Sequence, residues 1–170
     1  MRTILTPVAV GLGCDRGTPL ATVAQALDAA LAQAGLARAQ VAVLASIEAK
    51  RDEVALLELA ARGGWPLRFF SAAELAAVPV PHPSGTVLRY MGTPSVSEAA
   101  ALLAAGAGMA ALLVEKHKLR GEDGKNATVS IARMATTGAA TAHERKRVFT
   151  AGQACGSSLS WFSLSVFTST

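Results

Sequence analysis

The feature that most constrains this chain is a short apolar run that leads through a glycine-framed turn into an amphipathic stretch. The run covers Val8–Leu12, the turn covers Gly11–Thr18, and apolar residues then recur at helical spacing as far as Gly35. A strand buried on both faces is a continuous apolar run, so the pattern predicts a strand, a tight turn and a helix. We expect Thr18 to cap this helix, with Pro19 in its first turn.

The turn has two interpretations. Free backbone N–H groups at a helix start, together with the positive end of the helix dipole, favour an anion, and the guanidinium of Arg16 suits a carboxylate or a phosphate. Alternatively, the glycines only let the chain turn tightly. The spacing matches neither the dinucleotide fingerprint Gly-x-Gly-x-x-Gly nor a phosphate loop that ends in Gly-Lys-Ser/Thr, so no nucleotide is implied.

The same alternation of elements continues along the chain. Further strands are expected at Val41–Ile47, Pro66–Phe70, Thr86–Tyr90, Ala110–Glu115 and Thr128–Arg133. Between them, apolar spacing and cap signals predict helices. The pattern therefore predicts an α/β protein with three α/β/α layers, a mixed, mostly parallel sheet and a C-terminal β-hairpin. We expect one domain over residues 1–134, followed by a tail, residues 135–170, that is poorly ordered because it lacks turn signals.

Local signals predict details of the helices and loops. Val54, Leu57 and Ala61 recur at helical spacing and predict the buried stripe of the second helix. Two Ser-x-x-Glu sequences, Ser71–Glu74 and Ser95–Glu98, predict capping boxes at the start of two later helices.

Composition excludes several classes of function. Hydrophobic residues make up 51% of the 170 residues and charged residues 16%, which is typical of a globular protein. The net charge of +4 comes without a long basic run, so nucleic acid is not the expected partner. The stretch Ala99–Val114 is too short to span a bilayer, and no signal peptide is recognisable. Two cysteines and three scattered histidines predict a cytoplasmic protein with no metal site and no cofactor.

Basic residues follow several of the expected strands. Arg16 follows the first strand, Lys50 the second, and Lys116 and Lys118 the fifth, while Arg133 ends the sixth. Ligands of open α/β sheets bind at the carboxyl ends of parallel strands, so parallel strands would bring these cations to one edge. Such an edge suits a ligand with several carboxylates. The alternative is that these side chains are solvated and unrelated to one another.

Three residues are weak candidates for catalysis. Cys14 lies beside a helix start and Arg16, where the pKa of a thiol tends to fall. Glu48 could act as an acid or base, or pair with a neighbouring cation, and His117 stands between two lysines. A small buried residue is the alternative for Cys14, because no base is placed beside it at a convincing spacing. Asp15 could cap a helix or hold Arg16.

Six stretches in order resemble one family over about residues 4–134. They are Gly11–Thr18, Ala45–Lys50, Pro66–Leu75, Pro94–Leu102, Leu113–Lys118 and Thr128–Arg133. In this order they resemble the CobE/CbiG C-terminal domain family of cobalamin (vitamin B12) biosynthesis. The resemblance implies a place in the corrin-ring pathway, with binding or carriage of a polycarboxylate precorrin or corrinoid intermediate. It leaves open an enzyme that acts on the lactone or acyl fragment of a precorrin, and an interaction module that supports another pathway enzyme.

The residues and the resemblance together define a predicted ligand-binding set. Its members lie in the first turn, after the second strand, at the second capping box and around the last two strands: Gly13, Cys14, Asp15, Arg16, Gly17, Thr18, Glu48, Lys50, Ser95, Lys116, His117, Lys118 and Arg133. The expected partners are a corrinoid intermediate and other cobalamin-pathway enzymes, without nucleic acid or membrane. A homo-oligomer is left open, as are the strand order and the identity of the intermediate.

Overall fold

The computed structural model describes residues 6–92 and 95–135 of the chain. The tail predicted over residues 135–170 therefore lies, apart from Ala135, outside the described residues. None of the helices in the described ranges has the length and apolarity that crossing a bilayer requires.

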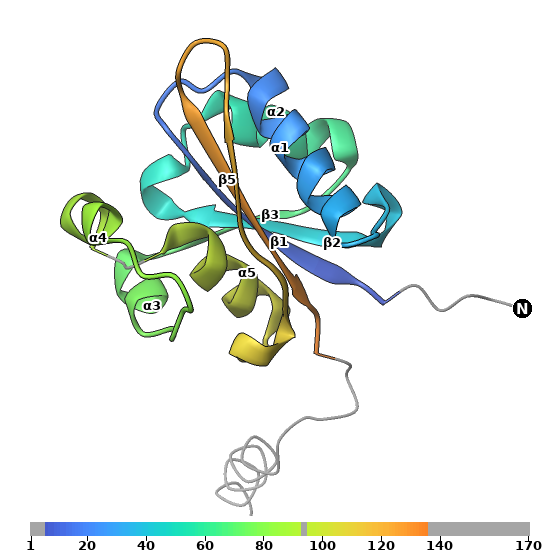
Figure 1. Cartoon of the computed structure of the whole chain (residues 1–170), viewed down its shortest axis with the longest axis vertical. Helices are drawn as coiled ribbons and strands as arrows, with labels where there is room; N and C mark the ends of the chain where they lie inside the picture. Colours follow the sequence, from blue (N-terminus) through green and yellow to red (C-terminus); the bar gives the residue numbers. More distant parts are fainter. Residues whose placement is uncertain (1–5, 93–94, 136–170) are drawn as a thin grey trace, which may run out of the picture. The chain divides into compact units, whose positions relative to one another are not determined.

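The sheet has five strands in the order β3-β2-β1-β5-β4 (Figure 1). Their bounds are β1 Val8–Cys14, β2 Val41–Ile47, β3 Leu67–Phe70, β4 Leu112–Arg120 and β5 Asn126–Arg133. β1, β2 and β3 are parallel, and β5 is antiparallel to both of its neighbours, β1 and β4. β4 consequently runs in the same direction as β1. This mixed, mostly parallel sheet with a closing hairpin confirms the predicted fold class.

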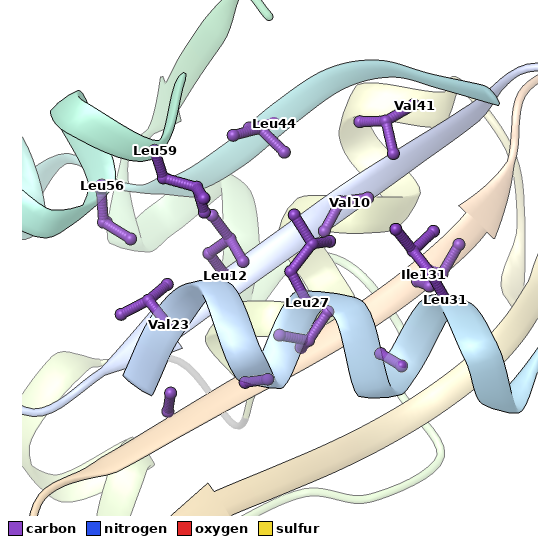
Figure 2. Close-up of a cluster of buried hydrophobic side chains, with 14 of the residues drawn as sticks. Val10, Leu12, Val23, Leu27, Leu31, Val41, Leu44, Leu56, Leu59 and Ile131 are labelled. Carbon is purple, nitrogen blue, oxygen red and sulfur yellow. The ribbon is translucent and has the colours of Figure 1, made fainter. Parts of the chain in front are cut away.

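Helices cover both faces of this sheet (Figure 1). On one face lie α1 (Leu20–Gln33) and α2 (Val54–Gly63), whose buried side chains form one core with β1, β2 and β5, as Figure 2 shows. On the other face, the alanine-rich α5 (Val96–Ala105) forms a second core with the sheet and α3 (Ala72–Ala76). α4 (Gly85–Met91) precedes α5, and short 3₁₀ turns precede β2, α2 and β4.

Two expected strand positions were wrong. Thr86–Tyr90 lies within helix α4, where backbone bonds such as Leu88 N to Ser84 O (2.9 Å) join residues four apart. A short run of β-formers becomes a strand only where it finds a partner strand, and this run finds none in the five-stranded sheet. The strand expected at Ala110–Glu115 is β4, which extends to Arg120. Lys116 and Lys118 therefore lie within this strand rather than after it.

The predicted inner stripe of α2 was also wrong. Val54 and Leu57 are 63% and 45% exposed, whereas the helix buries Ala55, Leu56, Leu59 and Ala60. Both sets recur at helical spacing, so periodicity alone does not choose between the two faces. The choice follows from contact with α1, because Leu56 and Leu59 pack into the core that α1 shares with the sheet (Figure 2).

Cap signals had mixed outcomes. The Ser71–Glu74 capping box forms as predicted, since the Ser71 hydroxyl accepts the Glu74 N–H and the Glu74 carboxylate accepts the Ser71 N–H. Thr18 does not cap α1, because Pro19 holds that position and the Thr18 hydroxyl donates to the Asp15 carbonyl at 2.7 Å. Ser95 precedes α5 without a side-chain cap bond.

Close packing of β1 on α5 depends on Gly11. A Cβ at this position would overlap the carbonyl oxygen of Ser97 and lie 2.7 Å from the Ala101 backbone nitrogen. Both are backbone atoms of α5, which cannot move aside as a flexible side chain does. The first turn of α5 is thereby held against the middle of β1.

We predict that Gly11→Ala lowers the free energy of unfolding by about 3 kcal/mol or more, because overpacking here displaces a whole helix. Gly108→Ala is the matched control, since a Cβ there meets no atom within 4 Å, and its effect should stay within about 0.5 kcal/mol. Urea titrations of both variants measure the difference. Equal stabilities would show that α5 is not fixed by this contact.

Candidate functional site

A cavity of about 420 Å³ opens where β1 and β2 end and α5 begins. We call it the strand-end cavity. Seven members of the predicted set line it: Gly13, Cys14, Asp15, Arg16, Lys50, Ser95 and Lys116. They come from the ends of β1 and β2, the start of α5 and the middle of β4, which meet there because β1, β2 and β4 run in the same direction. Ligands of open α/β sheets commonly bind at this kind of position.

The other six predicted residues lie outside the cavity wall. Gly17 and Thr18 line a neighbouring groove with Glu53 and Glu58, and exposed Glu48 pairs with Arg51 at 3.4 Å. His117 Nδ1 lies 3.2 Å from Gln33 Oε1 of α1, on the opposite face of the sheet from α5. Lys118 lines a groove beside β4, and Lys116 lines both this groove and the strand-end cavity.

Arg133 contradicts the prediction that all of these cations gather at one edge. It pairs with Val8 at the start of β1, whereas the cavity lies at the end of β1. The cause is the antiparallel direction of β5, which carries its last residue to the opposite edge of the sheet.

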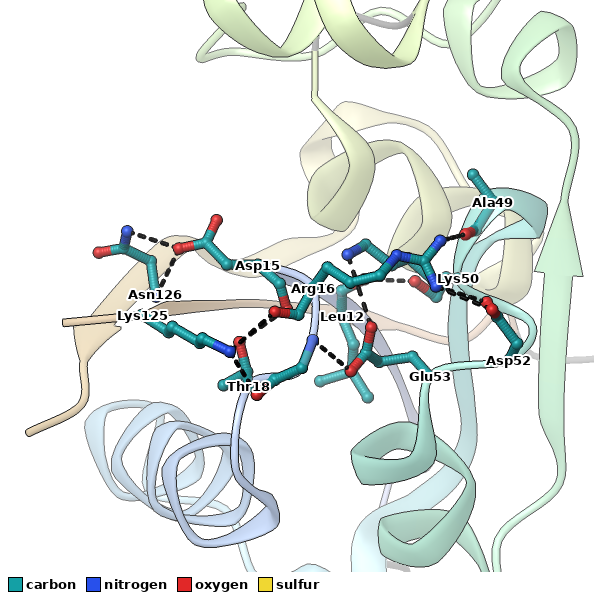
Figure 3. Close-up of polar contacts among 12 residues, drawn as sticks. Leu12, Asp15, Arg16, Thr18, Ala49, Lys50, Asp52, Glu53, Lys125 and Asn126 are labelled. Carbon is teal, nitrogen blue, oxygen red and sulfur yellow. Dashed lines mark hydrogen bonds and ion pairs between the residues drawn. The ribbon is translucent and has the colours of Figure 1, made fainter. Parts of the chain in front are cut away.

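Arg16 is neutralised by the chain itself (Figure 3). Its Nη1 donates to both carboxylate oxygens of Asp52 at 2.8 Å, and its Nη2 donates to the Ala49 carbonyl at 3.0 Å. The hydrogen bond from Arg16 holds the pKa of Asp52 below its usual value. Both side chains are more than half exposed, so this pair contributes little to stability. An external anion would have to compete with Asp52.

The predicted anion site of the first turn also has an internal occupant. Gly17, whose φ is +69°, donates its N–H to Glu53 Oε1 at 2.9 Å. The other oxygen of Glu53 lies 3.7 Å from Lys50 Nζ, and both side chains are 5% exposed (Figure 3). The carboxylate of Glu53 therefore takes the place that the sequence assigned to a ligand, and Lys50 compensates its charge.

The β4–β5 hairpin fastens the first turn from the other side. The Asp15 carboxylate accepts bonds from the backbone and side-chain nitrogens of Asn126 at 2.8 and 2.9 Å, so it holds neither Arg16 nor a helix start. Lys125 Nζ donates to the carbonyls of Arg16 and Gly17 at 3.0 and 2.8 Å (Figure 3). These contacts fix the position of the first turn, whose residues Asp15 and Arg16 form part of the cavity wall.

Sequence reasoning missed four polar lining residues: Thr86, Ser97, Asn126 and Thr128. Thr86 was assigned to a strand. Asn126 and Thr128 reach the cavity because β5 is antiparallel to β1 and begins where β1 ends, a pairing that follows from the strand order, which the sequence left open.

Cys14 lacks the character of a nucleophile. Burial raises the pKa of its thiol to about 11, although the charge of Lys50 acts in the opposite direction. The expected fall in the pKa of this thiol was therefore wrong, because desolvation outweighs the nearby cation. Cys14, Glu48 and His117 do not meet: the first lines the cavity, the second is exposed beside Arg51, and the third faces α1.

Lys116 lines both the strand-end cavity and the groove beside β4, and its ammonium group has no carboxylate within ion-pair distance in the described ranges. Among the described residues, its Nζ donates only to the His82 carbonyl, at 3.3 Å. Burial lowers its pKa below the usual lysine value, the charge of Lys118 acts in the same direction, and the charge of Glu98 opposes both. No cluster of three His, Cys, Asp or Glu side chains suited to a metal occurs in the described part of the chain.

Comparison with known proteins identifies relatives over most of the chain. Residues 8–132 match the family model described as "Cobalamin synthesis G C-terminus". The chain is 37% identical over 125 residues to a cobalt-precorrin-5A hydrolase of Priestia megaterium, of which it spans 32%, and 39% identical over 109 residues to Protein CobE of Sinorhizobium sp, of which it spans 70%. These alignments cover 74% and 63% of this chain.

A solved structure shares the fold. It is the crystal structure of CobE, a protein from the cobalamin (vitamin B12) biosynthetic pathway, with a TM-score of 0.66 and 32% sequence identity. The match covers 79% of this chain and 98% of that structure.

We predict that Cys14 reacts slowly with iodoacetamide. At pH 8 a thiol with a pKa of about 11 is about one part in a thousand thiolate, roughly 100-fold less than a thiol at the reference value of 9.0. The folded chain carrying Cys155→Ser should be alkylated about 100-fold more slowly than the same chain in urea, and its rate should rise with pH to about 11. A fast reaction at pH 7 would identify Cys14 as an activated nucleophile.

We predict that Lys50→Met destabilises the fold by about 3 kcal/mol, because it leaves the Glu53 carboxylate buried without its cation. Arg51→Met is the matched control, since it breaks an exposed pair with Glu48 and should cost under about 1 kcal/mol. Chemical denaturation measures both. If the pair is the cause, Glu53→Gln should recover part of the loss in the Lys50→Met background, whereas a loss that Glu53→Gln leaves unchanged contradicts it.

Proposed function

The chain belongs to the cobalamin synthesis G C-terminus family, as the sequence resemblance predicted, and on that premise we propose that it binds or carries a polycarboxylate precorrin or corrinoid intermediate. The family makes it a protein of cobalamin biosynthesis. The bound intermediate is our inference, and we place it in the strand-end cavity. Because the chain spans about a third of the hydrolase relative, the activity of that larger protein is not carried over.

The observation that carries the proposal is that Lys116 lines the cavity without an ion-pair partner in the described residues, with the charge of Glu98 acting on it only from beyond ion-pair distance. Arg16 and Lys50 also line the cavity, but Asp52 and Glu53 already neutralise them. A half-buried ammonium group is costly without a partner, so an external carboxylate that reaches Lys116 gains a charge-assisted hydrogen bond of about 1.5–3 kcal/mol. Corrin precursors carry acetate and propionate arms that can supply such a carboxylate.

The size of the cavity limits what enters it. Pockets that enclose drug-sized ligands measure about 300–1,000 Å³. At about 420 Å³, the strand-end cavity admits one edge of a tetrapyrrole macrocycle with its arms, while the rest of the ring stays outside. An open site of this kind suits a carrier, because the bound intermediate remains accessible to the next protein.

The alternatives raised by the sequence remain proposals of lower rank. An enzyme acting on the lactone or acyl fragment of a precorrin would need a nucleophile and a base in contact, which Cys14, Glu48 and His117 do not provide. The proposal of an interaction module for another pathway enzyme has no supporting observation in the described residues. We further propose a cytoplasmic location, since a chain with only two cysteines suits a reducing compartment.

We predict that Lys116→Gln weakens binding of hydrogenobyrinic acid about tenfold or more, because it removes the cation of the cavity wall that has no ion-pair partner in the described residues. Arg133→Gln is the matched control: it loses the same charge from an exposed position at the opposite edge of the sheet and should bind like the unaltered chain. The visible absorption of the corrinoid gives the binding curve. Absence of binding to the unaltered chain, or equal losses in the two variants, would overturn the proposed site.

A further inference from the structure

We propose that the first turn of α5 holds a carboxylate of the ligand, so that the bound arm acts as the missing cap of this helix. The inference rests on the proposed function and adds the position at which one arm is anchored. It identifies Ser95, together with the first-turn N–H groups of α5, as the anchor, and Lys116 as its counter-charge.

The first observation is an unsatisfied hydroxyl at the start of α5. Ser95 lines the strand-end cavity and is 1% exposed, yet its Oγ has no hydrogen-bond partner among the residues that the structure describes. Buried polar groups are almost always paired, so an unpaired one at a cavity wall indicates a partner that arrives from outside. A carboxylate oxygen can accept the proton of this hydroxyl.

The second observation is that the same sequence pattern behaves differently at two helices. At α3, Ser71 and Glu74 satisfy each other and close the helix start. At α5, Ser95 and Glu98 stand at the same spacing, but no side-chain cap bond forms. Both carboxylate oxygens of Glu98 are instead buried without a hydrogen-bond partner in the described ranges, and the side chain is outside the cavity wall. The start of α5 is left uncapped.

Helix geometry explains why an anion fits this place. The first N–H groups of a helix have no partner within the helix, and they carry the positive end of its dipole. α5 is ten residues long, and Val96 and Ser97 of its first turn line the cavity beside Ser95. By contrast, the turn before α1 is filled by Glu53, and α1 begins after Pro19, which has no N–H.

Lys116 completes the arrangement from the sheet. It lines the same cavity from β4, and its ammonium group lacks a carboxylate partner in the described part of the chain. One arm of the ligand can therefore receive N–H and O–H donors from α5 and face the cation of β4. An acetate or propionate arm fits this description, because its carboxylate is small and stands at the end of a flexible chain.

Substituting Ser95 tests the inference. Ser95→Asp places a carboxylate of the chain itself at the helix start, so it should raise the melting temperature and weaken hydrogenobyrinic acid about tenfold or more. Ser95→Ala should also weaken binding, while changing the melting temperature little because the hydroxyl makes no cap bond. Ser71→Ala is the matched control, since it removes a formed cap and should lower the melting temperature without affecting binding.

The outcomes separate this inference from the proposed function. If Lys116→Gln weakens binding but both Ser95 variants bind like the unaltered chain, the anchor at α5 is wrong and the cavity proposal stands. If Ser95→Ala lowers stability as much as Ser71→Ala, Ser95 is an ordinary cap and the anchor is likewise wrong. If the unaltered chain does not bind hydrogenobyrinic acid, the proposed function itself falls.

Discussion

The close approach of β1 to α5 at Gly11 is the constraint on which the candidate site depends. Because no side chain stands between the two backbones at this point, the first turn of α5 packs directly on β1, and Val96 lies beside Gly13 near the end of the strand. The strand-end cavity is the space left between that helix start, the ends of β1 and β2, and the side chain of Lys116. A larger separation would still leave a sheet covered by helices, but the hydroxyl of Ser95 would no longer share a wall with the residues that follow β1.

The chain itself neutralises two of the three cations that line the strand-end cavity. Asp52 engages Arg16, and Glu53 engages both Lys50 and the Gly17 N–H. Both carboxylates come from the segment after β2, so this segment shapes the electrostatics of the turn after β1. The cation left over is Lys116, which arrives from β4 through an antiparallel hairpin. Position in the sheet, rather than the number of basic residues, therefore determines which charge remains for a ligand.

The sequence predicted the frame of the fold and about half of the residues that line the strand-end cavity. Continuous apolar runs identified β1 and β2, and the family resemblance was confirmed over residues 8–132. The errors arose where local patterns have two solutions. The two faces of α2 have the same periodicity, and only contact with α1 decides between Leu57 and Leu56. Likewise, a basic residue in the sequence carries no sign of its internal partner, so the pairing of Arg16 with Asp52 and the burial of Lys50 could not be foreseen.

The incomplete start of α5 has a consequence for the lifetime of the protein. An unpaired hydroxyl and an unpaired carboxylate in the interior, those of Ser95 and Glu98, lower the stability of the empty fold. A molecule that binds only the folded chain raises its stability by mass action, by about 2.7 kcal/mol at one hundred times its dissociation constant. Proteases that degrade transiently unfolded chains would then remove the empty form faster than the loaded one. Under the proposed function, the cellular abundance of this protein would follow the supply of the bound intermediate without any dedicated regulator.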